Sequence, residues 1–84
     1  MEDNATHKLI LYNDDKNTFA YVMACLIRVC EHHPTQAEQC ALLVHEIGRC
    51  TVKHGDLLTM LEISESLRNL DLKTSVEIYE SNMH

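Results

Sequence analysis

Cysteine and histidine are the residue types in this sequence most able to do chemistry, since thiolates and imidazoles bind metals and act as nucleophiles and bases. The chain has four cysteines and six histidines. Cys30, His32 and His33 are close together but straddle the end of a predicted helix, and no C-x-x-C or H-x-x-x-H spacing occurs. Cys40 and His45, on another predicted helix, are roughly 140° apart around its axis, so they cannot form a nucleophile and base pair. We predict reduced core thiols, no metal and no other cofactor.

The adjacent carboxylates of Asp14 and Asp15 suggest general acid and base catalysis. Neighbouring residues that leave a strand tend to point apart, however, and no Gly-rich phosphate loop or nucleophile elbow accompanies this pair. We therefore predict that the chain is not an enzyme. Taken alone, Asn13-Asp14-Asp15 is typical of a turn. His45 lies one helical turn beyond Ala41, at the border of an apolar stripe, where its ring either bonds to the backbone or is held near a surface ligand.

Six predicted elements must position these residues. Apolar residues recur with helical spacing in three segments, and short apolar or alternating stretches indicate three strands. Such elements bury their apolar faces as two layers, with the helices on one face of a small sheet. The fold class is therefore α+β, a β-α-α-β-α-β sandwich with a three-stranded antiparallel sheet. The elements are strand 8–12, helix 19–30, helix 36–48, strand 49–54, helix 57–69 and strand 72–79.

Helix ends are marked by residues that satisfy free backbone groups. Asn17 or Thr18 caps the first helix, and Thr35 with Glu38 forms a capping box that opens the second. Gly48 suits the left-handed residue just beyond the second helix, and Asp56 can cap the third. The positions predicted to face inward are Phe19, Val22, Met23, Leu26, Ile27, Cys30, Ala37, Cys40, Ala41, Val44, Ile47, Cys50, Val52, Leu57, Met60, Leu61, Leu67, Leu72, Thr74, Val76 and Ile78.

Composition limits the partners. Thirteen acidic residues against seven scattered basic ones give a net charge of −6, which would repel a nucleic acid backbone. No apolar run approaches the roughly 20 residues that a bilayer requires, and residues 1–4 do not begin a signal peptide. We expect no nucleic acid, no membrane and a cytoplasmic location. At 84 residues, the chain is predicted to form one domain over residues 7–80, with flexible ends at 1–6 and 81–84.

Three segments together resemble the ClpS adaptor family. They are the run Lys-Leu-Ile-Leu-Tyr-Asn-Asp-Asp at 8–15, the helix that holds Phe19 and Val22, and Ala-Leu-Leu-Val-His-Glu-Ile-Gly at 41–48. The resemblance extends over about residues 7 to 78. It implies an adaptor that binds destabilising N-terminal residues (N-degrons) of substrates. The implied partners are proteins with a hydrophobic first residue and a hexameric AAA+ Clp unfoldase of the ClpA or ClpC type, which degrades them with its protease.

The resemblance also implies a binding site. Asn13, Asp14 and His45 would surround the free α-amino group of the substrate, a cation with three hydrogen-bond donors. The first side chain would enter an apolar pocket. Ala41 stands where many family members have Met, so we expect a roomier pocket, part of which Phe19 refills. The predicted pocket residues are Asn17, Thr18, Phe19, Val22, Ala41, Val44 and Leu72.

A second function remains open. A regulatory domain of the same fold could modulate a Clp unfoldase without recognising N-terminal residues. A metal-dependent or thiol enzyme is a third class, but it requires clusters of cysteine and histidine that the sequence lacks. Binding of a Leu-initiated peptide, compared with its N-acetylated form, separates the first two functions.

Overall fold

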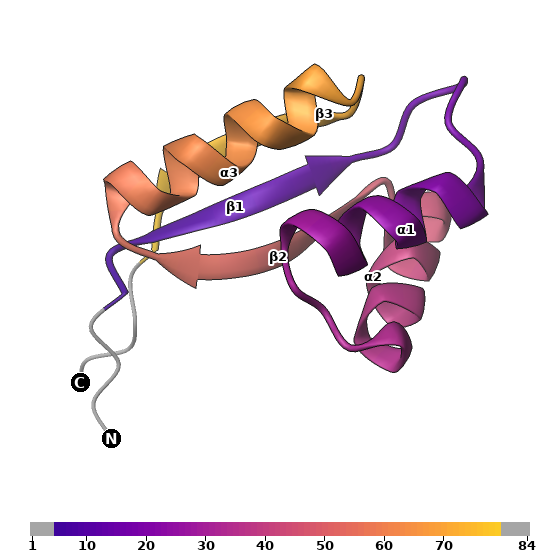
Figure 1. Ribbon diagram of the computed structural model, residues 1–84, viewed down its shortest axis with the longest axis horizontal. Coiled ribbons are helices and arrows are strands. Elements are labelled where there is room, and N and C mark those ends of the chain that lie inside the picture. Colours follow the sequence, from indigo (N-terminus) through magenta and orange to yellow (C-terminus); the bar gives the residue numbers. More distant parts are fainter. Residues whose placement is uncertain (1–4, 80–84) are drawn as a thin grey trace.

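The computed structural model describes residues 5–79 and has the predicted order of elements (Figure 1). The three strands form one antiparallel sheet in the order β2-β1-β3, so the first strand is central. The predicted α+β sandwich is confirmed. The elements are β1 (His7–Tyr12), α1 (Phe19–Val29), α2 (Pro34–Ile47), β2 (Arg49–Gly55), α3 (Leu57–Asn69) and β3 (Lys73–Ile78).

The helices lie on one face of the sheet. In Figure 1, α3 runs over the strands, and α1 and α2 lie together near the end where β1 leaves the sheet. Leu9 and Leu11 alternate with outward-facing residues along β1 and are completely buried. Leu26, Met60 and Leu67 complete the centre of the core, each at most 1% exposed. Burial of such side chains contributes about 1.5–3 kcal/mol each, which fixes the helices against the sheet.

Three of the four predicted caps are confirmed. The Thr18 hydroxyl accepts from the backbone N of Tyr21 at 3.0 Å, which decides between the two candidates for α1. Asp56 caps α3, and Gly48 ends α2 in the left-handed region at φ +107°. The capping box at Thr35 is wrong.

The helix α2 begins one residue before Thr35, at Pro34. His33 is the cap instead, because its Nδ1 accepts from the backbone N of Thr35 at 3.1 Å. Proline favours the first helical position, since its φ is preset and it lacks the N–H that would go unsatisfied there. The preference of proline for this position therefore outweighs the pattern of Thr35 and Glu38.

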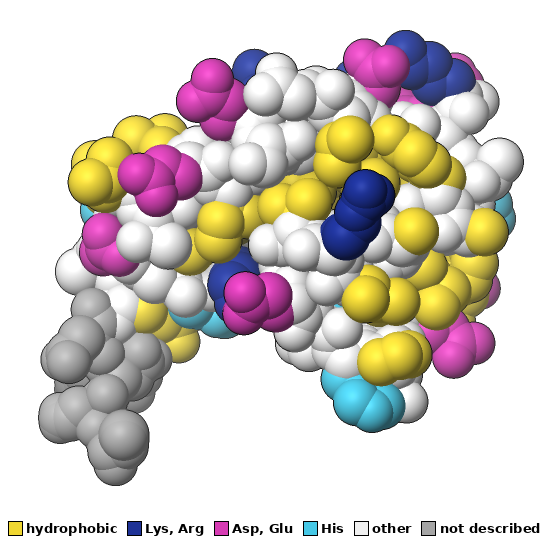
Figure 2. All heavy atoms as spheres, viewed as in Figure 1, with side chains coloured by type: hydrophobic (Ala, Val, Ile, Leu, Met, Phe, Trp, Pro, Cys, Tyr) yellow, Lys and Arg dark blue, Asp and Glu magenta, His cyan; other side chains and the backbone are white. Residues whose placement is uncertain are grey.

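Several residues predicted to face inward lie on the surface. Each helix buries only a narrow stripe; in α3 this stripe is Met60, Ser64 and Leu67. The flanking leucines of α3 therefore face solvent. Figure 2 shows apolar side chains gathered on the surface over α1 and α2 around a basic side chain. The exposed exceptions are Phe19, Ile27, Ile47, Leu57, Leu61 and Ile78, which are between 37% and 70% exposed.

The four cysteines are free thiols, three buried and one half-buried. Burial raises the pKa of Cys30 to about 11. Burial and a hydrogen bond with Cys40 raise the pKa of Cys50 to about 12. All but a trace of these two thiols is therefore protonated at neutral pH.

The predicted flexible ends fall mostly outside residues 5–79. Thr6 is described, and it is tied to the sheet: its N donates to the Gly55 carbonyl at 3.1 Å, and its carbonyl accepts from Tyr79 N at 2.9 Å. Across the described residues, no helix has both the length and the apolar character to cross a bilayer.

Candidate functional site

A small cavity lies where α1, α2 and the loop after β1 meet. Its volume is about 20 Å³. Seven of the ten predicted site residues line it, from three separate segments of the chain. They are Asn13, Asn17, Phe19, Val22, Ala41, Val44 and His45.

The apolar wall of the cavity belongs to the core. Val22 on α1 and Ala41 and Val44 on α2 are 8%, 2% and 3% exposed. Their positions follow from helical spacing, since Ala41 and Val44 are three residues apart and share a face of α2. Phe19, the first residue of α1, is different because it is 40% exposed. Its ring is therefore much less buried than the rest of the wall.

The polar side of the cavity consists of Asn13 and His45, both exposed. The backbone N of Asn13 donates to the carbonyl of Gly48 at 2.9 Å, which joins the loop after β1 to the end of α2. His45 lies in the last turn of that helix. This bond extends the pairing of Tyr12 with Arg49, and together they bring two segments that are about thirty residues apart in sequence side by side.

Asp14 does not line the cavity. Its Oδ1 accepts from the backbone N of Lys16 at 2.9 Å and of Asn17 at 2.8 Å, and its Oδ2 accepts from Asn17 Nδ2 at 2.8 Å. Partial desolvation raises the pKa of this carboxyl, but the hydrogen bonds from Asn17 and Lys16 together outweigh it and hold the pKa below its ordinary value. Asp14 is one hydrogen bond away from the cavity, through Asn17, and it carries a negative charge.

Asn17 has a bridging role that sequence reasoning missed. Its Nδ2 also donates to the carbonyl of Asp71 at 2.9 Å, and nearby the Tyr21 hydroxyl donates to the carbonyl of Leu70 at 2.7 Å. The turn between α3 and β3 is thereby fastened to the start of α1. An aspartate that bonds to the backbone two and three residues ahead is a local pattern that could have indicated the first half of this network. No local pattern indicates the contacts to residues 70 and 71.

Two further predicted residues lie away from the cavity. The hydroxyl of Thr18 is used as the cap of α1. Leu72 is 3% exposed in the main core and borders a different hollow of about 530 Å³, which it shares with Asp14, Arg68 and Lys73. Fewer residues therefore line the candidate site than the sequence predicted.

Ala41, from which a roomier pocket was expected, lines the cavity, but the cavity itself is small. A cavity of about 20 Å³ has room for about one water molecule. Phe19, which was expected to refill part of the space, does line the cavity. A leucine or phenylalanine side chain therefore enters only if the lining moves.

The residues first suspected of metal or thiol chemistry have structural partners. The ring Nε2 of His32 donates to the carbonyl of Val52 at 2.8 Å, and His33 caps α2. Cys40 is buried, while His45 is exposed. Within residues 5–79, no group of three His, Cys, Asp or Glu side chains is arranged to hold a metal ion. The chemistry that the cavity offers is acceptance of hydrogen bonds beside an apolar wall.

These features define a small α+β domain whose candidate site is a shallow, part-polar cavity. A family model described as "ATP-dependent Clp protease adaptor protein ClpS" matches residues 2–75, so the chain belongs to the ClpS family. Among solved structures, one similar chain comes from "The structure of Agrobacterium tumefaciens ClpS2 bound to L-phenylalaninamide". It is 17% identical, covers 92% of this chain and 100% of its own, and has a TM-score of 0.77, which shows the shared fold. No curated protein matches the sequence.

Proposed function

We propose that this protein binds the N-terminal residue of substrate proteins and delivers them to a hexameric AAA+ Clp unfoldase of the ClpA or ClpC type for degradation. The proposal rests on one observation. Asn13 and His45 line the same cavity as the apolar residues Val22, Ala41 and Val44. An N-terminal residue has the same two parts, an ammonium group and an adjoining side chain.

The polar side of the cavity suits an ammonium group. The Asn13 side-chain oxygen and the unprotonated ring nitrogen of His45 are acceptors, and the ammonium has three donors. Asp14 adds a negative charge behind Asn17. A hydrogen bond to a charged group contributes about 1.5–3 kcal/mol, so two of them account for a preference for a free amino group over an acetylated one.

The apolar side suits the first side chain once the cavity opens. Side-chain rotation on binding is common, and Phe19 is exposed enough to rotate. L-phenylalaninamide, the compound bound to Agrobacterium ClpS2, carries a free amino group and an apolar side chain. That chemistry supports a hydrophobic first residue as the ligand here.

Delivery is supported by the family, which is described as adaptors of the ATP-dependent Clp protease. An adaptor needs binding surfaces and no catalytic group, and we place the protein in the cytoplasm with its unfoldase. Asn13, Asp14 and His45 are the proposed amino-group residues. The proposed side-chain pocket is formed by Asn17, Phe19, Val22, Ala41 and Val44. Thr18 supports it as the cap of α1, and Leu72 supports it from the core.

The test is a titration of the protein with a Leu-initiated peptide and its N-acetylated twin. We expect acetylation to weaken binding about tenfold or more, because it removes the charge and donors. Asp14→Ala and His45→Ala should weaken binding of the free peptide and leave the acetylated one unchanged. Asp15→Ala and Glu46→Ala are the matched controls, since both are exposed neighbours that do not line the cavity. Equal binding of the two peptides would overturn the proposal.

The volume of the cavity favours a second candidate, a regulatory domain that modulates the unfoldase without recognising N-terminal residues. In that case neither peptide binds, while the protein still changes the rate at which the unfoldase degrades other substrates. A degradation assay with an internal-tag substrate therefore separates the two functions.

A further inference from the structure

The face of the sheet opposite the helices carries three rows of side chains, one at each outward residue of β1. Residues paired across antiparallel strands point to the same face. Lys8, Ile10 and Tyr12 therefore share this face with their partners on both neighbouring strands. We call this surface the outer sheet face, formed by His54, Lys8 and Glu77, by Thr51, Ile10 and Ser75, and by Arg49, Tyr12 and Lys73.

The centre of the outer sheet face is apolar. Ile10 is only 4% exposed although the three helices lie on the other face, so the surrounding side chains cover it. The Tyr12 hydroxyl is within 2.8 Å of Ser75 Oγ, which fixes the ring at one side. A hollow of about 250 Å³ lies over Ile10 and is bordered by Lys8, Arg49 and Ile47. Ile47 is 70% exposed at the end of α2.

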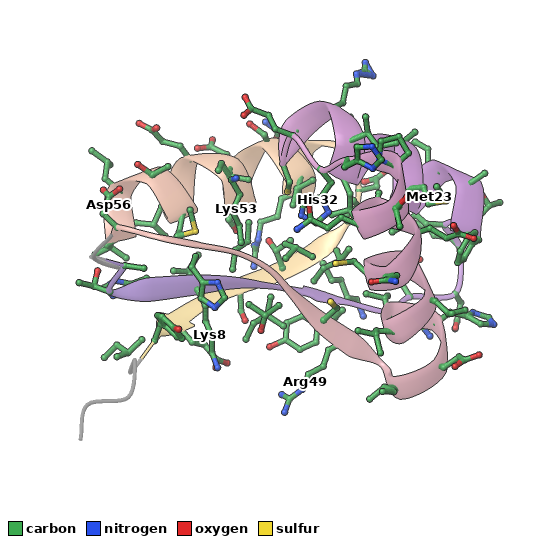
Figure 3. The ribbon with its side chains drawn as sticks, turned by 90° about the horizontal axis from the view of Figure 1, so that it is seen from below. Lys8, Met23, His32, Arg49, Lys53 and Asp56 are labelled. Atoms are coloured by element: carbon green, nitrogen blue, oxygen red, sulfur yellow. The ribbon has the colours of Figure 1, made fainter. Side chains whose placement is uncertain are left out.

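The outer sheet face is positive on a negative protein, and its Lys8 and Arg49 border the hollow. Lys8, Arg49 and Lys73 oppose Glu77, an excess of two positive charges on a chain whose net charge is −6. Figure 3 shows Lys8 and Arg49 on the side of the strands away from α3. Between residues 5 and 79 these cations have no carboxylate within 4.0 Å, and the ion pair found there is at Lys16. Their charges are available to a partner.

We propose that the outer sheet face binds an acidic, extended segment of a partner protein. Lys8 lies four residues along β1 from Tyr12, which pairs with Arg49, so the two cations are about 13 Å apart along the strand direction. An extended segment spans that distance in four residues and points every second side chain to one side. The matching pattern is acidic, any, apolar, any, acidic, with the apolar side chain over Ile10 and beside Ile47.

Other occupants fit this surface less well. A second copy placed face to face would set the same excess of positive charge on both sides of the contact. A nucleic acid would meet Glu77 on the face and the negative charge of the whole chain. The cavity between α1 and α2 lies on the other side of the sheet, so this inference does not depend on the proposed N-terminal recognition.

The experiment titrates the isotopically labelled full chain with the peptide acetyl-GESLSEG-amide, which has no free amino group. We expect amide shift changes at Ile10, Thr51 and Ser75. Arg49→Glu should weaken binding about tenfold, because one contact becomes repulsive. The matched control is Arg28→Glu, which makes the same change of charge on the exposed surface of α1 and should alter affinity less than about twofold.

Four results would overturn the inference. They are no shift change on the outer sheet face at millimolar peptide, equal binding of acetyl-GQSLSQG-amide, an equal loss of affinity in Arg28→Glu, and tighter binding of single-stranded RNA to the same residues. Shift changes at these residues that depend on protein concentration without peptide would instead assign the face to a second copy.

Discussion

The two sides of the candidate cavity are held in place by different forces. Val22, Ala41 and Val44 are at most 8% exposed and are part of the hydrophobic core, so they are positioned whenever the domain folds. Asn13 and His45 are exposed and, in the described part of the chain, have no side-chain hydrogen bond. Their backbone is fixed, because His45 lies in the last turn of α2 and the N of Asn13 donates to the carbonyl of Gly48. The apolar wall therefore contributes to stability, whereas the polar side is free to respond to a ligand.

The largest expected difference is between two adjacent residues of α2. Val44→Ala should lower the free energy of unfolding by about 2 kcal/mol, because it removes two buried methyl groups and leaves a void. His45→Ala should change it by less than about 0.5 kcal/mol, as is usual for an exposed side chain. Urea unfolding followed by circular dichroism measures both values. Similar losses in the two variants would show that His45 is held by the fold after all.

Gly48 connects the apolar wall of the cavity with its polar side, because it ends α2 and its carbonyl accepts from the N of Asn13. Its φ of +107° is a conformation that an L side chain rarely adopts, although no atom lies within 4 Å of an added Cβ. Gly48→Ala should therefore cost about 1–2 kcal/mol through backbone strain alone. Gly48→Asn is the control and should cost less, since asparagine tolerates this region. If Gly48→Ala is neutral by urea unfolding, the bond to Asn13 does not depend on the left-handed turn.

Thr18 tests whether a predicted pocket residue acts through the helix end instead. Thr18→Ala should lower the free energy of unfolding by about 1 kcal/mol, because the N of Tyr21 loses its acceptor. Thr18→Ser keeps the hydroxyl and should stay close to the parent. Peptide affinity should be nearly unchanged in both, since Thr18 does not line the cavity. A loss of affinity in Thr18→Ser would place the lost methyl group in the binding site.

The apolar wall could be predicted from the sequence, but the polar side could be predicted only in part. Spacing of three and four residues puts Val22, Ala41 and Val44 on buried helix faces, and a turn is evident at Asn13. The direction of Asp14 depends on hydrogen bonds to Asn17, and the place of Leu72 depends on how α3 meets the sheet. Local pattern carries no such information. The volume of the cavity depends on how Phe19, Val22, Ala41 and Val44 lie together around it, which the size of the side chain at Ala41 alone does not give.

The smallest expected effect is the loss of stability at low pH that Asp14 contributes. Its folded pKa is below the ordinary value of 3.8, so its contribution to stability is complete above that value and is lost as the pH falls from there through the folded pKa. Asp14→Asn removes this part of the pH dependence, and Asp15→Asn, whose side chain makes no hydrogen bond within residues 5–79, should not. Asp56, the cap of α3, also has a lowered pKa, caused by its hydrogen bonds with Thr59, so some acid sensitivity remains in Asp14→Asn. Urea unfolding at pH 6 and pH 3 measures the difference between variants. If Asp14→Asn keeps the full pH dependence of the parent protein, the Asp14 hydrogen bonds do not fix the loop. The polar side of the cavity would then be less rigid than the hydrogen bonds of Asp14 indicate.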